Sequence, residues 1–363
     1  MGTCAPANAT GPSAAWYAAA PGNTPTLLQP LVSGKNCGAS GIADDGVIVG
    51  SCANASNISF AVVWSSSTAL APTQLQPLSL LQTGLLADVS TAATAYNQNG
   101  VVIGESISGS GAATPVVWSN GSSTPIIVGP YASNCAAVDD TQTTVNGQPS
   151  IALDCPTNPS SANPGPSFGA IAQNTALLGG FVVNKLPLPT DATNCSVSGL
   201  NDSVQAVGTC RFSNSAGPQA AFWATPTSTP ILASLSGSPN STGVFINASG
   251  NVALNYLNSN GLVQAAFWNT TTDVVSPISP LTGGTTAVVT CLGDNNTVTL
   301  TSEIGNQQPE AAEWTPATGN TVALGDLNGG QESGAGGCNK GGTAAIVDGQ
   351  DSNQNQVGGE SNL

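Results

Sequence analysis

The pentapeptide Gln219-Ala-Ala-Phe-Trp223 decides the fold, because it returns almost unchanged as Gln264-Ala-Ala-Phe-Trp268. Repetition of a short pattern at a fixed period indicates one supersecondary unit that must stack on its neighbours to bury a core. Weaker copies of the pattern end at four further tryptophans: Trp16, Trp64, Trp118 and Trp314.

The unit between Trp223 and Trp268 contains four short strands separated by turn residues, which predicts an antiparallel meander. Pro277 lies in the last of them, and proline cannot donate to a sheet on both sides, so this run is predicted to be an edge strand. The four predicted strands are residues 242–247, 251–256, 262–268 and 274–280.

The tryptophans lie 45 to 54 residues apart, except for one gap of 105 residues between Trp118 and Trp223. A gap of two units predicts one unit without its tryptophan, with Ala172 near the vacant position. The chain therefore holds seven units, and radial stacking of four-stranded sheets is a β-propeller. A linear solenoid would instead need atypical capping repeats at its ends.

The two ends of the chain look complementary, which favours a closed ring. We expect a third strand at residues 14–16 and a fourth at 24–32 from the N-terminus, with a first strand at 343–347 and a second at 356–360 from the C-terminus. Together these strands would make one composite blade. The expected architecture is thus an all-β, seven-bladed propeller forming a single domain over residues 1–363.

The repeat resembles the extracellular HAF repeat, whose pattern runs Ala-Phe-x-Trp, then Leu-Gly-x-Leu-Gly-Gly, then Ile-Asn-x-x-Gly-x-Val-Val-Gly. The matching segments here are Ala-Ala-Phe-Trp223, Leu324-Gly-Asp-Leu-Asn-Gly-Gly330, Ile246-Asn-Ala-Ser-Gly250 and Gly46-Val-Ile-Val-Gly50. The resemblance spans the whole chain. It implies a secreted bacterial protein and leaves the activity open.

Composition excludes several classes of function. The net charge is −15, with no histidine and four cations: Lys35, Lys185, Arg211 and Lys340. Without a basic patch, binding to nucleic acid or to anionic membranes is not expected. No apolar run reaches the length of a membrane span. Nine cysteines favour an oxidising compartment, so we expect a secreted or cell-surface protein whose signal peptide has been removed.

The cysteine positions predict three bridges within single blades, namely Cys37–Cys52, Cys135–Cys155 and Cys195–Cys210, because each pair flanks one first-to-second strand hairpin. Cys4 lies twelve residues before Trp16, as Cys52 does before Trp64. We therefore expect Cys4 to pair with Cys338 across the composite blade. Cys291 has no such partner and is expected to be a buried free thiol.

Acidic residues recur in the turns between first and second strands, where they would ring one mouth of a central channel: Asp44, Asp45, Asp139, Asp140, Asp202 and Asp294. Oxygen-rich turns of this kind bind calcium. Aspartate is also an ordinary turn residue, because its side chain caps the local backbone. These residues are the candidate binding site, with calcium as the one cofactor considered.

Catalysis is not expected, because a chain without histidine supplies neither a Ser-His-Asp triad nor a histidine-ligated metal. Glu105, Glu303 and Glu360 lie near the ends of predicted second strands, where a carboxylate pair could hydrolyse glycosides; solvent-facing rim positions are the simpler interpretation. The repeated tryptophans suggest stacking on sugars, but filling the space between adjacent sheets is the simpler role.

Three hypotheses on function remain. The preferred one is a non-catalytic propeller that binds a glycan, a surface polymer or a protein through a face of loops. The others are a structural subunit that self-assembles into an extracellular layer or fibre, and a carbohydrate-active enzyme that uses rim carboxylates.

Overall fold

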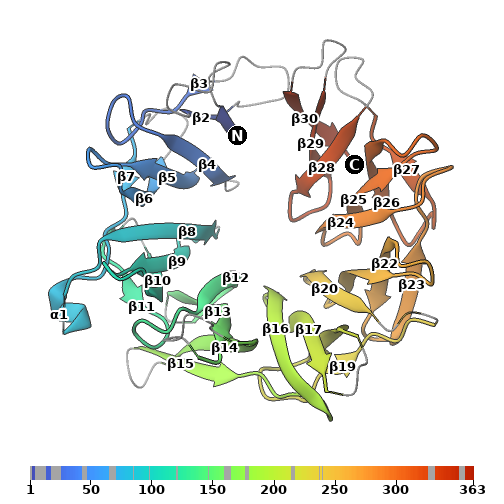
Figure 1. Cartoon of the computed structure of the whole chain (residues 1–363), viewed down its shortest axis with the longest axis horizontal. Helices are drawn as coiled ribbons and strands as arrows, with labels where there is room; N and C mark the ends of the chain where they lie inside the picture. Colours follow the sequence, from blue (N-terminus) through green and yellow to red (C-terminus); the bar gives the residue numbers. More distant parts are fainter. Residues whose placement is uncertain are drawn as a thin grey trace. The chain divides into compact units, whose positions relative to one another are not determined.

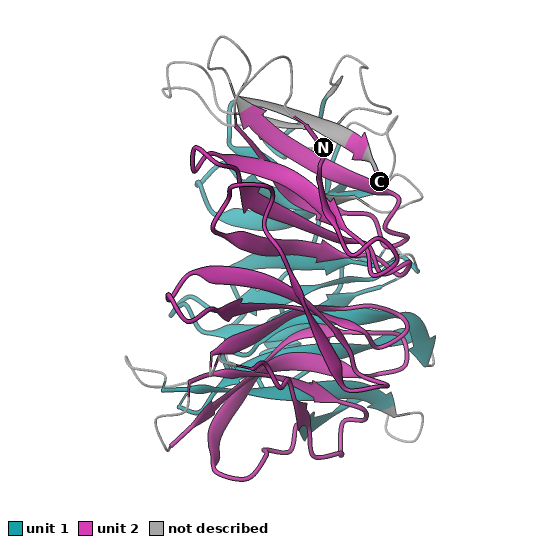
Figure 2. Ribbon diagram, turned by 90° about the vertical axis from the view of Figure 1, so that its right-hand side faces the viewer, with its two compact units in different colours: residues 1–185 teal, residues 186–363 magenta. Residues whose placement is uncertain are grey.

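The computed structural model divides the chain into two compact units, residues 1–185 and 186–363 (Figure 2). Each unit is described by itself. The described residues are 2–4, 14–17, 26–42, 47–64, 71–84, 86–97, 99–119, 122–145, 147–158, 165–175, 180–213, 217–236, 238, 240–325, 332–350 and 356–363.

Each unit contains three four-stranded antiparallel sheets and one three-stranded sheet, with strands in chain order (Figure 1). In residues 1–185 the sheets are β1 Gly2–Cys4, β2 Ala14–Tyr17 and β3 Thr26–Leu27; β4 Cys37–Ile42, β5 Ile48–Ala53, β6 Ser59–Trp64 and β7 Thr73–Gln74; β8 Ser90–Tyr96, β9 Val102–Ile107, β10 Ala113–Trp118 and β11 Ile126–Ile127; and β12 Ala136–Val145, β13 Gln148–Pro156, β14 Ser167–Thr175 and β15 Gly180–Lys185.

Residues 186–363 repeat this organisation, with the three-stranded sheet last. The sheets are β16 Ala192–Leu200, β17 Ala206–Phe212, β18 Gln219–Trp223 and β19 Ile231–Leu232; β20 Ser241–Ile246, β21 Val252–Leu257, β22 Val263–Asn269 and β23 Val274–Ile278; β24 Ala287–Leu292, β25 Val298–Glu303, β26 Pro309–Trp314 and β27 Thr321–Ala323; and β28 Ser333–Cys338, β29 Ala344–Gln350 and β30 Gln356–Asn362.

The predicted meander is confirmed in β20–β23, whose bounds agree with the four predicted strands to within two residues. Strand β23 contains Pro277 and lies at the edge of its sheet, as its proline requires. Six of the seven predicted blades are continuous in the chain, and each is found. In the described part of the chain the one helix is the four-residue α1 Leu80–Thr83.

The predicted composite blade is wrong in its strands. The two ends of the chain form separate three-stranded sheets, and residues 344–350 are the second strand of the last sheet rather than the first. The first strand is β28, whose sequence Ser-Gly-Ala-Gly-Gly-Cys was not recognised because glycine is depleted in strands. Ring closure and the single domain stay predictions.

Each first strand carries a β-bulge opposite its second strand, in all seven described hairpins of this type. The bulge brings the two backbones close, and glycine occupies the second-strand position opposite it in three hairpins: Gly50, Gly104 and Gly208. A Cβ atom at Gly208 would lie 2.0 Å from the Ser196 carbonyl oxygen. The motif Val-Ile-Val-Gly50 therefore ends in glycine because any side chain there would clash with the backbone of the first strand.

The tryptophans are core residues, which confirms the simpler of the two predicted roles. Trp64, Trp118, Trp223 and Trp268 are each at most 1% exposed, and Trp314 is buried; the side chain of Trp16 lies outside the described part. Three of the indole Nε1 atoms donate to backbone carbonyls of the connection that precedes their sheet: Gln29, Gln76 and Pro187. Each tryptophan thereby ties the third strand of its sheet to this connection.

The unit without a tryptophan is where it was predicted. Ala172 of β14 pairs with Ile151 of β13, just as Trp64 of β6 pairs with Ile48 of β5. Ala172 is fully buried and packs in a cluster with Phe181 and Val183 at its edge. Side chains of the neighbouring strand therefore occupy part of the space that an indole fills elsewhere.

The three predicted hairpin disulfides are confirmed as Cys37–Cys52, Cys135–Cys155 and Cys195–Cys210, with Cα–Cα distances of 4.0 to 4.2 Å. Hydroxyl side chains stand at the equivalent first-strand positions of three other hairpins. There Thr91, Ser241 and Ser333 accept a hydrogen bond from the backbone N–H of Ala61, Ala220 and Ala311 in the preceding sheet.

The predicted Cys4–Cys338 bridge and the free thiol at Cys291 are both wrong, because Cys291 is bonded to Cys338. This bridge joins β24 to β28, the first strands of two neighbouring sheets, with a Cα–Cα distance of 5.7 Å. Counting residues back from the tryptophan also misplaced Cys4. By strand register Cys4 is the counterpart of Gly50, not of Cys52, because the β1–β2 connection is longer than the β5–β6 connection.

Candidate functional site

The turns between first and second strands form the candidate site in each unit, and we call the turns of one unit its hairpin face. An asparagine begins most of these turns and accepts backbone N–H groups two and four residues further on. Asn97 accepts from Asn99 and Val101, Asn201 from Ser203 and Gln205, and Asn247 from Ser249 and Asn251. These are Asx turns, in which the side chain replaces a backbone acceptor.

Asparagine side chains also link the turns of successive sheets within one unit. In residues 186–363, Asn201 Nδ2 donates to the Asn247 carbonyl at 2.9 Å, and Asn247 Nδ2 donates to Asn296 Oδ1 at 2.8 Å. Asn295 Nδ2 continues the chain of contacts to the Gly342 carbonyl at 2.8 Å. Because these groups hold one another, the hairpin face of this unit is an ordered polar surface.

The described aspartates of the predicted site take part in this network. Asp140 is buried and accepts from Asn97 Nδ2 at 2.8 Å, while Asp139 accepts from the Asp140 backbone N–H at 2.9 Å. Asp294 accepts from the Ala248 backbone N–H at 2.8 Å. Asp44 and Asp45 lie outside the described residues. The predicted turn position is confirmed for Asp294, whereas it is wrong for Asp139 and Asp140, which lie within β12 because that strand continues to Val145.

Asp202 makes the longest-range contact of the hairpin face. Its carboxylate pairs with Lys340 Nζ at 2.9 Å, from the β16–β17 turn to the β28–β29 turn. Two complete sheets, β20–β23 and β24–β27, separate these turns in the sequence. Both side chains are partly exposed, so the pair offers one carboxylate and one ammonium group to a ligand.

The calcium hypothesis gains nothing from this geometry. Within the described residues no group of three or more acidic, cysteine or histidine side chains converges as metal ligands would. The aspartates instead accept hydrogen bonds from backbone and side-chain amides and, at Asp202, from the Lys340 ammonium group.

Sequence reasoning missed a second set of contacts, between second strands and the bulges of the following sheet. Asn255 Oδ1 accepts from the Val289 backbone N–H, and Thr301 Oγ1 accepts from that of Ala335. Both acceptors follow the second-strand residue opposite their own bulge. Their recurrence 46 residues apart was the available signal, but a polar residue in a strand gives no indication of which neighbour it faces.

Glu105 occupies the same position and is therefore a structural carboxylate rather than a rim acid. Burial raises the pKa of Glu105, and a hydrogen bond from the Ala137 backbone N–H lowers it by less. Glu303 lies in β25, two residues after Thr301, and so does not occupy this acceptor position. Thr285 Oγ1 donates a hydrogen bond to the Glu303 carboxylate at 2.6 Å. That hydrogen bond lowers the pKa of Glu303.

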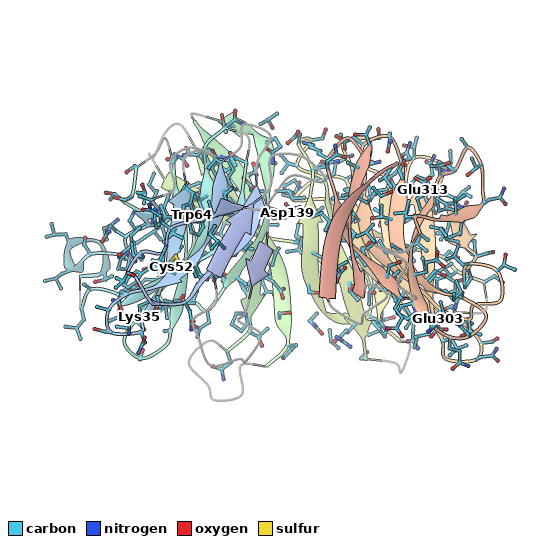
Figure 3. All side chains as sticks on the ribbon, turned by 90° about the horizontal axis from the view of Figure 1, so that it is seen from above. Lys35, Cys52, Trp64, Asp139, Glu303 and Glu313 are labelled. Carbon is cyan, nitrogen blue, oxygen red and sulfur yellow. A yellow bond between two sulfur atoms is a disulfide. The ribbon has the colours of Figure 1, made fainter. Side chains whose placement is uncertain are left out.

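The three glutamates of the enzyme hypothesis do not share one position. Glu105 lies within a second strand and Glu303 ends one, whereas Glu360 belongs to β30, a third strand, with its side chain outside the described part. Within its sheet, Glu303 also lies far from Glu313, and the two glutamates stand near opposite ends of the strands (Figure 3).

Glu105→Gln is expected to change how stability depends on pH. A raised carboxyl pKa means that the folded state holds the proton more tightly than the unfolded chain, so the free energy of unfolding falls as pH rises above about 4.5. Glutamine keeps an acceptor for Ala137 and removes the charge. The variant should therefore be more stable than the wild type at pH 7, by about 1 kcal/mol or less, and similar to it at pH 4.

Urea unfolding at several pH values measures this difference, with Glu303→Gln as the matched control. Because the pKa of Glu303 is lowered, its carboxylate stabilises the fold above pH 4.5, and the control should be less stable than the wild type at pH 7. A Glu105→Gln variant that loses stability at pH 7 would contradict this prediction, because the hydrogen bond from Ala137 to the carboxylate would then outweigh the cost of burying the charge.

No family model matches the chain, and no curated protein matches its sequence. Solved structures match its fold. The β-propeller domain of the Trilobed protease from Pyrococcus furiosus, described as having an open velcro topology, aligns with a TM-score of 0.52 and 12% identity over 85% of each chain.

Two peptidases align over most of this chain as well. A prolyl endopeptidase gives a TM-score of 0.56 at 10% identity over 89% of this chain, and a puromycin-hydrolyzing peptidase from Mycobacterium tuberculosis gives 0.55 at 8% over 90%. The chain spans about half the length of both, 49% and 51%. At such identities the likeness shows the fold alone, which is that of a β-propeller.

Proposed function

We propose that the chain is a non-catalytic binding propeller, secreted or held at the cell surface, whose hairpin face binds a glycan, a surface polymer or a protein. The observation that carries this proposal is the continuous network of Asx turns in residues 186–363. A surface whose polar groups are already ordered loses little conformational entropy on binding, which favours affinity.

The chemistry of this face favours a neutral, hydroxyl-rich ligand or a cationic one. Its groups are carboxamides, carboxylates and backbone amides, and the whole chain carries a net charge of −15. Amides and carboxylates hydrogen-bond to hydroxyl groups, whereas an anionic ligand would be repelled.

The peptidase neighbours do not lead us to propose a peptidase activity. The chain has no histidine, so it cannot build a Ser-His-Asp triad by itself. Glu105 and Glu303 are engaged in hydrogen bonds within the fold.

The proposed location rests on the disulfides. Four bridges are the pattern of a protein that folds in an oxidising compartment. Among the described residues, no helix has the length and apolar character that crossing a bilayer requires. Membership of the HAF-repeat family, which the sequence motifs suggest, is part of the same proposal.

A glycan array that includes neutral and cationic polysaccharides tests the proposed function. The variant is Asp202→Ala/Lys340→Ala, which removes an exposed ion pair that contributes little stability. The control is Asn260→Ala in the β21–β22 turn, at the opposite end of its sheet. We expect the wild type and the control to bind one class of glycan, and the double variant to bind it at least about tenfold more weakly, about 1.4 kcal/mol. Binding that is lost equally in the control would contradict a site on the hairpin face, and no binding to any polymer would contradict the glycan and polymer ligands and leave a protein.

A further inference from the structure

The connection between β7 and β8 differs from the other connections between an outermost strand and the next first strand. It contains 15 residues, whereas the six others contain six to nine. The additional residues include α1, which stands away from the strands on either side of it (Figure 1). Ordered loops that project from a repeated scaffold often carry binding residues, so this connection is a candidate binding surface.

This connection is held in one conformation at its base. The Asp88 backbone N–H donates to the Leu78 carbonyl at 2.9 Å, which closes the loop. The Asp88 carboxylate is 5% exposed and accepts from Ser106 Oγ at 2.6 Å and from the Tyr131 hydroxyl at 3.2 Å. The first hydrogen bond thus closes the loop, and the other two tie its end to β9 and to the connection that follows β11.

The helical part of the loop is also fixed. Gln82 accepts from the Ser79 backbone N–H at 3.0 Å, and its Nε2 donates to the Pro125 carbonyl at 2.7 Å. Gly84 ends α1 in the left-handed conformation, at a φ of 68°, and its N–H returns to the Leu80 carbonyl. The N-terminus of α1 is therefore capped by Ser79 and Gln82, and its C-terminus by Gly84.

The loop nevertheless directs its large apolar side chains outward. Leu81 is 96% exposed and Leu86 is 81% exposed, while Leu80 and Val89 are 54% and 43% exposed. No residue of α1 is buried, so the helix adds nothing to the core. We call Leu80, Leu81, Leu86 and Val89 the leucine surface. A rigid apolar group of this kind marks an interaction site on a soluble protein.

The distribution of charge indicates what covers the leucine surface. Between Asp45 and Glu105 the sequence has one charged side chain, the buried Asp88. The net charge of −15 therefore arises elsewhere, and it opposes contact between two copies through most other surfaces. This segment contains Leu81 and Leu86, the most exposed leucines among the described residues, and almost no charge. Two copies would therefore meet there with the least electrostatic repulsion.

We propose that two copies of this chain associate through their leucine surfaces, in a symmetric pair in which each loop packs against the other. A two-fold arrangement places the same apolar surface on both sides of the contact. A contact of a few leucines is small, so the dimer is weak and depends on protein concentration. The proposal does not rest on the proposed function, although pairing would present two hairpin faces to a multivalent ligand.

Sedimentation velocity of the full chain, over roughly 10 µM to 1 mM protein, tests this proposal. We expect the wild type to shift from monomer towards dimer as concentration rises, and Leu81→Ser/Leu86→Ser to remain a monomer. The matched control is Val145→Ser/Val322→Ser, two exposed apolar residues elsewhere that are 57% and 50% exposed. This control should dimerise as the wild type does, and more salt should not weaken the dimer, because salt screens the repulsion.

Thermal unfolding shows whether the leucine variant keeps its fold, as exposed positions predict. A wild type that stays monomeric at the highest concentration would overturn the proposal and assign the leucine surface to a different partner. A leucine variant that dimerises as the wild type does would overturn it as well, because the contact would then lie elsewhere.

Discussion

Trp223→Ala is expected to lower the free energy of unfolding by about 3–5 kcal/mol, the range for removing a large buried aromatic side chain. Trp223 is fully buried, and its Nε1 donates to the Pro187 carbonyl at 2.9 Å. Alanine leaves a cavity and also leaves that carbonyl without its donor. Both losses fall on the contact between a sheet and the connection that leads into it.

Urea unfolding followed by far-ultraviolet circular dichroism measures this effect. Trp223→Phe separates the two losses, because it keeps most of the ring volume and removes the Nε1 donor; we expect a smaller loss of about 1–3 kcal/mol. Val322→Ala, at a half-exposed position, serves as the control and should change stability by less than about 0.5 kcal/mol. A loss below about 1 kcal/mol for Trp223→Ala would contradict this prediction and show that the buried indole contributes little to stability.

Cys291→Ser/Cys338→Ser is expected to lower the free energy of unfolding by about 2–4 kcal/mol. The bridge closes a loop of 47 residues, which is about the length of one repeat and runs from β24 to β28. Without it, the unfolded chain regains the freedom that the bridge removes, and the last sheet loses its covalent link to its neighbour. The double substitution avoids leaving one unpaired thiol.

Cys195→Ser/Cys210→Ser is the matched comparison, because this bridge closes a loop of only 15 residues within one hairpin. The chain-entropy model makes the longer loop more stabilising by about 1 kcal/mol. Peptide mapping without reduction should first recover Cys291 joined to Cys338. Recovery of Cys338 joined to Cys4 would contradict the structure, and equal stability of the Cys291→Ser/Cys338→Ser variant and the wild type would show that the inter-sheet bridge is dispensable.

The sequence by itself determined the unit of the fold. The spacing of the tryptophans set the repeat, the turn residues separated the strands of β20–β23, and the position of Ala172 followed from counting. Cysteines that flank one hairpin identified Cys37–Cys52 and its two equivalents, because residues close in sequence on adjacent antiparallel strands must lie opposite each other. All of these properties depend on local patterns within one sheet.

The tertiary structure alone decided how neighbouring sheets contact each other. Cys291 pairs with Cys338 because two first strands lie side by side, a relation that no distance along the chain expresses. Counting from the tryptophans also failed for Cys4, since the loop between β1 and β2 changes the register. Glu105 accepts from a bulge in the next sheet for the same reason. Strand periodicity specifies which residues share a face, whereas bulges, loop lengths and packing determine what that face meets.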